Sequence, residues 1–204
     1  MRDEVNKGNN TINAVLVEDI VLNRDVLSDD GALNRGMFTA WTPIGTTSSA
    51  YNGVFDGNGH SVSGLYYSDA NGLCVGLFGC VGMRGVVRDL TVDDSYLKGK
   101  NAVGAIAGYN AGIVESCVNE SLVIGGAAVG GIVGLNDGTV ENCTDNGWVT
   151  SDDALNGGII GGTNSGEDSD VPNAGDKNNL VLWVMILFVG LGAVSITWIK
   201  RKLN

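Results

Sequence analysis

The middle of the chain repeats a short motif at a nearly constant step, and this repetition limits the possible folds more than any other feature. Each copy has an early glycine, apolar residues and a closing glycine, and successive copies begin 28, 26 and 27 residues apart. A unit this short cannot bury an apolar face by itself, so neighbouring copies must stack. The copies are Val75-Gly76-Leu77-Phe78-Gly79, Val103-Gly104-Ala105-Ile106-Ala107-Gly108, Val129-Gly130-Gly131-Ile132-Val133-Gly134 and Asn156-Gly157-Gly158-Ile159-Ile160-Gly161.

A second motif keeps pace with the first, at residues 85–90, 112–117 and 138–143. The motifs contain short runs of β-branched residues that glycine interrupts. Such runs disfavour helices, because each interior glycine costs a helix about 1 kcal/mol. The sequence therefore predicts two or three brief strands per repeat, stacked as a parallel β-solenoid with a thin Val, Ile and Leu core. Equivalent positions then lie about 4.8 Å apart. Leu90, Cys117 and Cys143 are predicted to form one inward column.

Together the two motifs resemble the GLUG repeat of bacterial surface proteins. Residues 41–45 lead into residues 53–65 in an order similar to the segment that commonly precedes such repeats. The resemblance covers roughly residues 12–164 and implies an all-β, right-handed parallel β-helix on the outer surface of the cell. Members are large exported proteins, including adhesin-like chains and the non-catalytic part of some immunoglobulin-cleaving metallopeptidases. We expect about five or six coils.

The end of the chain predicts a membrane span. Residues 180–199 carry no charge, and Lys200, Arg201 and Lys202 follow at once. A helix of this length is about 30 Å long and matches the hydrocarbon layer of a bilayer. Trp183 and Trp198 lie near its ends, where indole rings favour the headgroup boundary. The basic cluster predicts that residues 200–204 are cytoplasmic and that the N-terminal part is extracellular; the alternative is a buried core helix.

The segment before this stretch resembles a cell-wall sorting signal of Gram-positive bacteria, which sortase transpeptidases recognise. Carried over by position, the resemblance implies a cut between Ala174 and Gly175 and attachment to peptidoglycan. Val171 and Ala174 replace the usual Leu or Asn and Thr. The alternative is a plain membrane anchor with a polar linker. The sorting motif consists of Val171, Pro172, Asn173, Ala174 and Gly175.

Composition excludes one class of partner. The net charge is −11, and nucleic-acid binding needs a basic surface. Such a charge suits a self-repelling external domain, or one that attracts cations. Residues 1–11 contain no apolar stretch of signal-peptide type, so we expect a fragment of a longer protein; a misassigned start and a tail-anchored cytosolic protein are the alternatives.

Few residues suggest catalysis, and neither a metal nor a cofactor is expected. His60 is the only histidine, and no HExxH motif occurs, so we predict a structural role for it. Gly57-Asn58-Gly59 lacks the spacing of a dinucleotide-binding loop and is interpreted as a turn.

The four cysteines form no CxxC pair, which disfavours zinc. Cys117 and Cys143 occupy the same repeat position and are close enough for a disulfide, but we favour stacked buried thiols. Cys74 and Cys80 flank the first copy of the motif and have no partner by register.

Paired carboxylates raise the possibility of a carbohydrate-active enzyme. Asp93 aligns with Glu120 and then Asn146, and Asp94 aligns with Ser121, which allows a partial carboxylate ladder. All pairs lie where turns are expected, so solvated turns are the favoured interpretation. The pairs are Asp29-Asp30, Asp93-Asp94 and Asp152-Asp153.

A column of opposite charges is also predicted on the outer surface. Glu115 and Glu141 should stack on Arg88, an exposed pairing that contributes little to stability.

These features predict a non-catalytic display and adhesion module on the cell surface. Its partners would be the membrane, sortase with peptidoglycan, and a host or polysaccharide ligand. A carbohydrate-active β-helix enzyme, or a spacer for a catalytic domain missing upstream, is the alternative. The predicted parts are residues 1–11 (truncated N-terminal segment), 12–164 (solenoid), 165–179 (acidic linker with the sorting motif), 180–199 (membrane helix) and 200–204 (basic tail).

Overall fold

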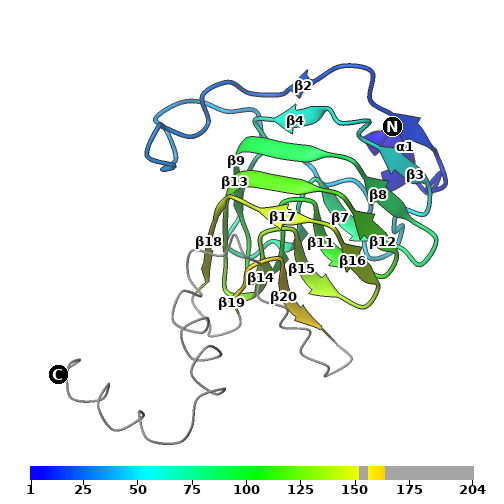
Figure 1. Ribbon diagram of the computed structural model, residues 1–204. Coiled ribbons are helices and arrows are strands. Elements are labelled where there is room, and N and C mark those ends of the chain that lie inside the picture. Colours follow the sequence, from blue (N-terminus) through cyan, green and yellow to red (C-terminus); the bar gives the residue numbers. More distant parts are fainter. Residues whose placement is uncertain (152–155, 164–204) are drawn as a thin grey trace, which may run out of the picture. The chain divides into compact units, whose positions relative to one another are not determined.

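The computed structural model describes residues 1–151 and 156–163, and this part of the chain is a parallel β-solenoid (Figure 1). Four sheets, numbered here 1 to 4, surround the core. Sheet 1 contains β1 (Ala14–Val15), β3 (Val54–Asp56), β8 (Val86–Arg88), β12 (Ile113–Glu115) and β16 (Thr139–Glu141). Sheet 2 contains β2 (Ile20–Val21), β4 (Ser61–Ser63), β9 (Thr91–Lys98), β13 (Val118–Gly125) and β17 (Thr144–Asp145), with β5 (Tyr66–Ser68) beside β9 and β18 (Trp148–Ser151) beside β13.

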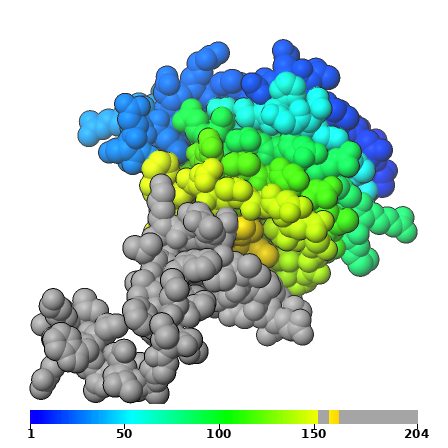
Figure 2. All heavy atoms as spheres, in the orientation of Figure 1, coloured from blue at the N-terminus to red at the C-terminus, as the bar shows by residue number. Residues whose placement is uncertain are grey.

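The other two sheets contain four strands each. Sheet 3 contains β6 (Leu73–Val75), β10 (Asn101–Val103), β14 (Ala127–Gly130) and β19 (Asn156–Gly157). Sheet 4 contains β7 (Phe78–Val81), β11 (Ala107–Asn110), β15 (Val133–Asn136) and β20 (Ile160–Thr163). The described residues therefore make about four turns, fewer than the five or six predicted. Figure 2 shows the turns stacked in chain order, from blue to yellow.

The register of sheet 3 confirms the repeat. Val75 pairs with Val103, Val103 with Val129, and Val129 with Asn156, all in parallel. Val75, Val103 and Val129 are fully buried, so each repeat adds one turn and one residue to the same core column.

Each turn contains more strands than predicted, because glycine divides the first motif into two strands. A Cβ atom on Gly104 would lie 2.5 Å from the carbonyl oxygen of Ala107. A Cβ atom on Gly108 would lie 2.4 Å from the carbonyl carbon of Cys74 in the turn before it. Backbone therefore packs directly on backbone at this corner, and the chain bends from β10 into β11.

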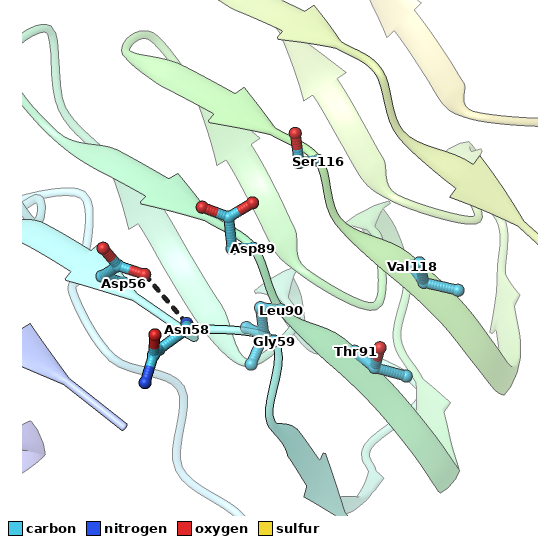
Figure 3. A pocket seen from close by; sticks show the side chains of 8 residues that line it. All are labelled: Asp56, Asn58, Gly59, Asp89, Leu90, Thr91, Ser116 and Val118. Carbon is cyan, nitrogen blue, oxygen red and sulfur yellow. Dashed lines mark hydrogen bonds between the residues drawn. The ribbon is translucent and has the colours of Figure 1, made fainter. Parts of the chain in front are cut away.

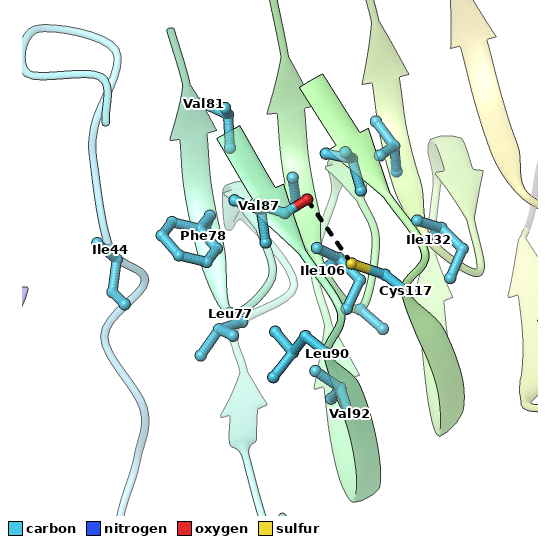
Figure 4. Packing of buried hydrophobic residues seen from close by; sticks show 14 of the residues in the cluster. Ile44, Leu77, Phe78, Val81, Val87, Leu90, Val92, Ile106, Cys117 and Ile132 are labelled. Carbon is cyan, nitrogen blue, oxygen red and sulfur yellow. Dashed lines mark hydrogen bonds between the residues drawn. The ribbon is translucent and has the colours of Figure 1, made fainter. Parts of the chain in front are cut away.

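The predicted inward column is present. Leu90, Cys117 and Cys143 are 1%, 0% and 8% exposed. The amide of Val118 donates to the carbonyl of Leu90 over 2.8 Å, and Thr144 repeats this bond to Cys117 over 2.9 Å. In Figure 4, Leu90 and Cys117 point into a core that also contains Phe78 and Ile106.

The first turn is closed by the N-terminal segment. Isolated parallel bridges join Ile44 to Phe78 and Tyr51 to Val81, which adds an incomplete rung to sheet 4. The short helix α1 (Arg2–Asn6) buries Val5 completely at this end.

An excursion from the first turn, residues 26–34, crosses the outer side of sheet 2, and we call it the arm. Leu27 and Leu33 form an antiparallel bridge, so the arm is a small hairpin. A Cβ atom on Gly31 would lie 2.7 Å from the ring of Trp148, so the arm reaches from the first turn to β18. Trp148 is more than a hundred residues away from the arm in the sequence.

Several predictions concern residues outside the described part of the chain. They are the acidic linker at 165–179, the sorting motif at 171–175, the membrane helix at 180–199 and the tail at 200–204. Within residues 1–151 and 156–163, no helix is long and apolar enough to cross a bilayer.

Candidate binding groove

The chain passes from sheet 1 to sheet 2 through a sharp corner in each of four successive turns. The corner residues have φ between +50° and +54°, a left-handed conformation that Asn and Asp adopt more readily than other non-glycine residues. At the first corner, Asp56 accepts a hydrogen bond of 2.8 Å from the amide of Asn58. This confirms the turn predicted at residues 57–59. The corner residues are Asn58, Asp89, Ser116 and Asn142.

A groove of about 380 Å³ lies at this corner. Val118 contributes apolar surface, and Asp56, Asn58, Asp89, Thr91 and Ser116 contribute polar side chains (Figure 3). Leu90 adjoins the groove, but its side chain is 1% exposed and points into the core. The groove spans three successive turns, since its residues come from the corners that follow β3, β8 and β12. It is lined by Asp56, Asn58, Gly59, Asp89, Leu90, Thr91, Ser116 and Val118.

Arg88 neutralises one side of the groove. Its guanidinium donates to Asp56 Oδ2 over 2.8 and 3.1 Å, and its Nε lies 3.9 Å from Asp89 Oδ2. The hydrogen bond from Arg88 is the main reason why the pKa of Asp56 lies below its usual value. Glu115 pairs in register with Arg88 and with Glu141, as predicted, but the ion pairs of Arg88 are made with Asp56 and Asp89.

Three polar groups of the groove remain available to a ligand. Within the part of the chain that the structure describes, the hydroxyl groups of Thr91 and Ser116 make no hydrogen bond. Asp89 has only its long contact to Arg88. In Figure 3, Asp89 and Ser116 project from adjacent turns, and Thr91 and Val118 lie on neighbouring strands.

The outer face of sheet 2 continues from the groove and holds one carboxylate pair. Asp93 pairs in register with Ser63 on one side and with Glu120 on the other, as predicted for Glu120. Burial raises the pKa of Asp93, a hydrogen bond with Ser63 opposes this, and Glu120 adds to the rise. Asp93 Oδ1 is buried and has no hydrogen-bond partner.

The predicted alignment of Asp94 with Ser121 is wrong, because β9 contains a bulge. The register shifts between Glu120 and Leu122, and Leu122 pairs with Tyr96. Asp94 is the inserted residue, with φ of +41°. Its carboxylate accepts hydrogen bonds from the amides of Val26 and Leu27, over 3.2 and 2.7 Å, and so holds the arm.

The remaining acidic pairs do not add to the groove. Asp30 lies in the arm and accepts a hydrogen bond from Ser28 Oγ over 2.6 Å. Asp152 and Asp153 lie outside the described residues. Across the described ranges, no group of three or more His, Cys, Asp or Glu side chains could hold a metal ion.

His60 lies outside the groove lining and bridges two turns. Its Nδ1 atom is 3.1 Å from Asp19 Oδ1, which also accepts a hydrogen bond of 2.9 Å from the amide of Ser61. This geometry fits the structural role predicted for His60.

The cysteines form two neighbouring pairs of free thiols. The amide of Cys117 lies 3.5 Å from the sulfur of Cys143, and the interaction with Cys143 raises the pKa of the Cys117 thiol. Cys74 and Cys80 also share a hydrogen bond, which lowers the pKa of Cys74. Register could not reveal this pair, because both residues belong to one turn, on either side of the bend between β6 and β7.

Comparisons with known proteins agree with this architecture. Residues 125–150 match the model of the GLUG motif. A protein of Evansella cellulosilytica named as a Gly-rich membrane protein is 34% identical over 79 residues, which are 37% of this chain and 9% of that protein. Halomucin of Haloquadratum walsbyi is 32% identical over 90 residues, which are 44% of this chain and 1% of halomucin. The chain therefore spans a small part of the length of either relative.

One solved structure has a similar fold. It is the crystal structure of a protein from Bacteroides ovatus named as an immunoglobulin A1 protease, and it superimposes with a TM-score of 0.53. The match covers 76% of this chain and 56% of that chain at 20% sequence identity. At this identity the likeness concerns the fold alone, which is that of a β-solenoid.

Proposed function

We propose that the chain is a non-catalytic binding module displayed on the outer surface of a cell. The main support for this proposal is the corner groove, which opens on the outer side of the solenoid and presents Asp89, Thr91 and Ser116 to a ligand. The GLUG match and the names of the two relatives, a Gly-rich membrane protein and halomucin, support the surface location. We take the solenoid to wind in the right-handed sense, as most parallel crossovers do.

Attachment forms the second part of the proposal. Residues 180–199 would span the membrane, and residues 200–204 would remain in the cytoplasm. Sortase would cleave between Ala174 and Gly175 and join the new carboxylate to peptidoglycan. The apolar and basic pattern of the C-terminal sequence supports this arrangement.

The distribution of carboxylates favours binding over catalysis. A glycoside hydrolase needs two carboxyl groups that flank one bond of the substrate. Asp56 is paired with Arg88, and Asp94 is occupied by two amides of the arm. Asp93 and Glu120 lie on neighbouring strands of an open face, and neither lines the groove. The carbohydrate-active enzyme is therefore the less supported alternative.

Expression of the full chain behind a secretion signal of a Gram-positive host tests display and attachment separately. We expect an antibody against the solenoid to label intact cells, and the chain to be found in the wall fraction. Ala174→Pro should block cleavage and move the chain to the membrane fraction, whereas Asn173→Ala, at a variable motif position, should not. Equal wall fractions for Ala174→Pro and the unmodified chain would disprove sortase attachment, and unlabelled cells would disprove display.

A further inference from the structure

We infer that the corner groove binds a polysaccharide that is rich in hydroxyl groups and carries no acidic groups. This inference deepens the proposed binding role and depends on it, because it names the class of ligand. Its basis is the combination of apolar surface, unpaired polar groups and negative charge at one repeated corner.

The groove complements a sugar, which has both an apolar face and hydroxyl groups. Val118, which is partly exposed, can contact the apolar C–H face of a sugar ring. The carboxylate of Asp89 can accept hydrogen bonds from sugar hydroxyls, and the hydroxyls of Thr91 and Ser116 can donate or accept. A hydroxyl-rich ligand can satisfy all three groups, whereas an apolar ligand would leave them without partners.

Charge decides between kinds of polysaccharide. Asp56 and Asp89 line the groove, and Arg88, the nearby cation, already donates two hydrogen bonds to Oδ2 of Asp56. A uronate carboxylate would therefore face Asp89 without a free cation to offset the repulsion. The groove should accept neutral chains and reject acidic ones.

The repetition of the corner favours a polymer over a single sugar. Asn58, Asp89, Ser116 and Asn142 take the same conformation in four successive turns. Successive turns of a parallel solenoid are about 4.8 Å apart, so these side chains form a row along the stack. An extended chain lying along this row can contact several turns at once, which strengthens binding through linked contacts.

Binding can be measured with the purified full chain in detergent, on surfaces that carry dextran, mannan, xylan, alginate or poly-L-lysine. We expect retention on at least one of the three neutral polysaccharides and none on alginate. Raising the salt concentration from about 0.1 to about 1 M should change this binding little, because the ligand is uncharged. Failure of all three neutral polymers, or equal retention on alginate, would overturn the inference; preferential, salt-sensitive retention on poly-L-lysine would point to a basic peptide instead.

Variants locate the site. Asp89→Asn keeps a residue that tolerates the corner conformation but removes the charged acceptor, so we expect about a tenfold loss of affinity. Val118→Lys should weaken binding as well, because it replaces apolar surface with a charge. Glu141→Gln is the matched control, since it removes a carboxylate on sheet 1 outside the groove, and it should bind normally. Unchanged affinity in both groove variants would disprove the assignment of the binding site to the corner groove.

The experiment separates this inference from the proposed function. Display is measured by labelling intact cells, and ligand binding is measured with purified protein. Neutral-polymer binding without display would leave the groove assignment intact and remove the surface role. Display without neutral-polymer binding would leave the surface role intact and remove the groove assignment.

Discussion

Single residues enforce the close stacking of the turns, and the motif glycines are the clearest case. Gly134 closes the third copy of the motif, and a Cβ atom there would lie 2.3 Å from the amide nitrogen of Val103. The contact is with backbone, which cannot move aside as the end of a flexible side chain can. The glycine spacing in the sequence therefore indicates where the backbones of successive turns pack against each other, at the corner between sheets 3 and 4.

Gly134→Ala should destabilise the solenoid by about 3 kcal/mol, because the new methyl group must push two backbones apart. Gly162→Ala is the matched control, since the nearest atoms to its Cβ lie at an ordinary contact distance of 3.6 Å. Chemical denaturation followed by circular dichroism measures both changes. Equal midpoints for the two variants would contradict this account of the corner.

Asp93 predicts a dependence of stability on pH. Its pKa is raised in the folded state, so the folded chain favours the protonated carboxyl group. This contribution is present below the unfolded pKa of about 3.9 and is lost as the pH rises through the folded value. Asp93→Asn should therefore raise the unfolding midpoint at neutral pH and change it little in acid.

The control for Asp93 is Asp29→Asn, which removes an exposed carboxylate in the arm and should leave the midpoint nearly unchanged. The measurement is thermal unfolding at several pH values between about 3 and 8. A destabilised Asp93→Asn chain at neutral pH would show that the charged carboxylate is stabilised by a partner.

At the scale of elements, the sequence predicts the regular strands but not the arm. The repeat step predicts the stacking of Val75, Val103 and Val129, because one register relation recurs in every turn. The contacts of the arm with Asp94 and with Trp148 do not follow the repeat, so no periodicity in the sequence indicates them. The groove could not be predicted either, because the sequence indicates only turn residues at the corner and not that they line a groove.

Asp94→Ala should release the arm without unfolding the turns, because it removes the acceptor of the amides of Val26 and Leu27. Limited digestion with trypsin tests this, since the exposed Arg24 and Arg35 flank the arm. We expect faster cleavage at these two sites, by about tenfold, as the lost hydrogen bonds to a charged group would allow. Asp29→Ala should digest at the original rate, and an unchanged rate for Asp94→Ala would assign the hold on the arm to other contacts.

At the scale of the whole molecule, the described part of the chain is a stack in which each turn contacts the turns before and after it. Stability in such a stack is approximately a sum over turns and the interfaces between them. Sheet 3 shows the consequence, since Val103 and Val129 occupy equivalent positions and both are followed by glycine. A complete turn can therefore be removed without changing the local sequence at the junction.

Deletion of residues 104–129 joins Val103 to Gly130 and recreates the Val-Gly step of the motif. We expect a folded solenoid with the same β-type circular dichroism, a lower unfolding midpoint and a smaller denaturant slope, because less surface is buried. Deletion of residues 104–128 is the matched control. It moves every later motif residue by one position, so that Val133 would replace Gly108, where a Cβ atom would lie 2.4 Å from the carbonyl carbon of Cys74. The in-register deletion should fold and its control should not; if both unfold alike, the turns do not behave as interchangeable units.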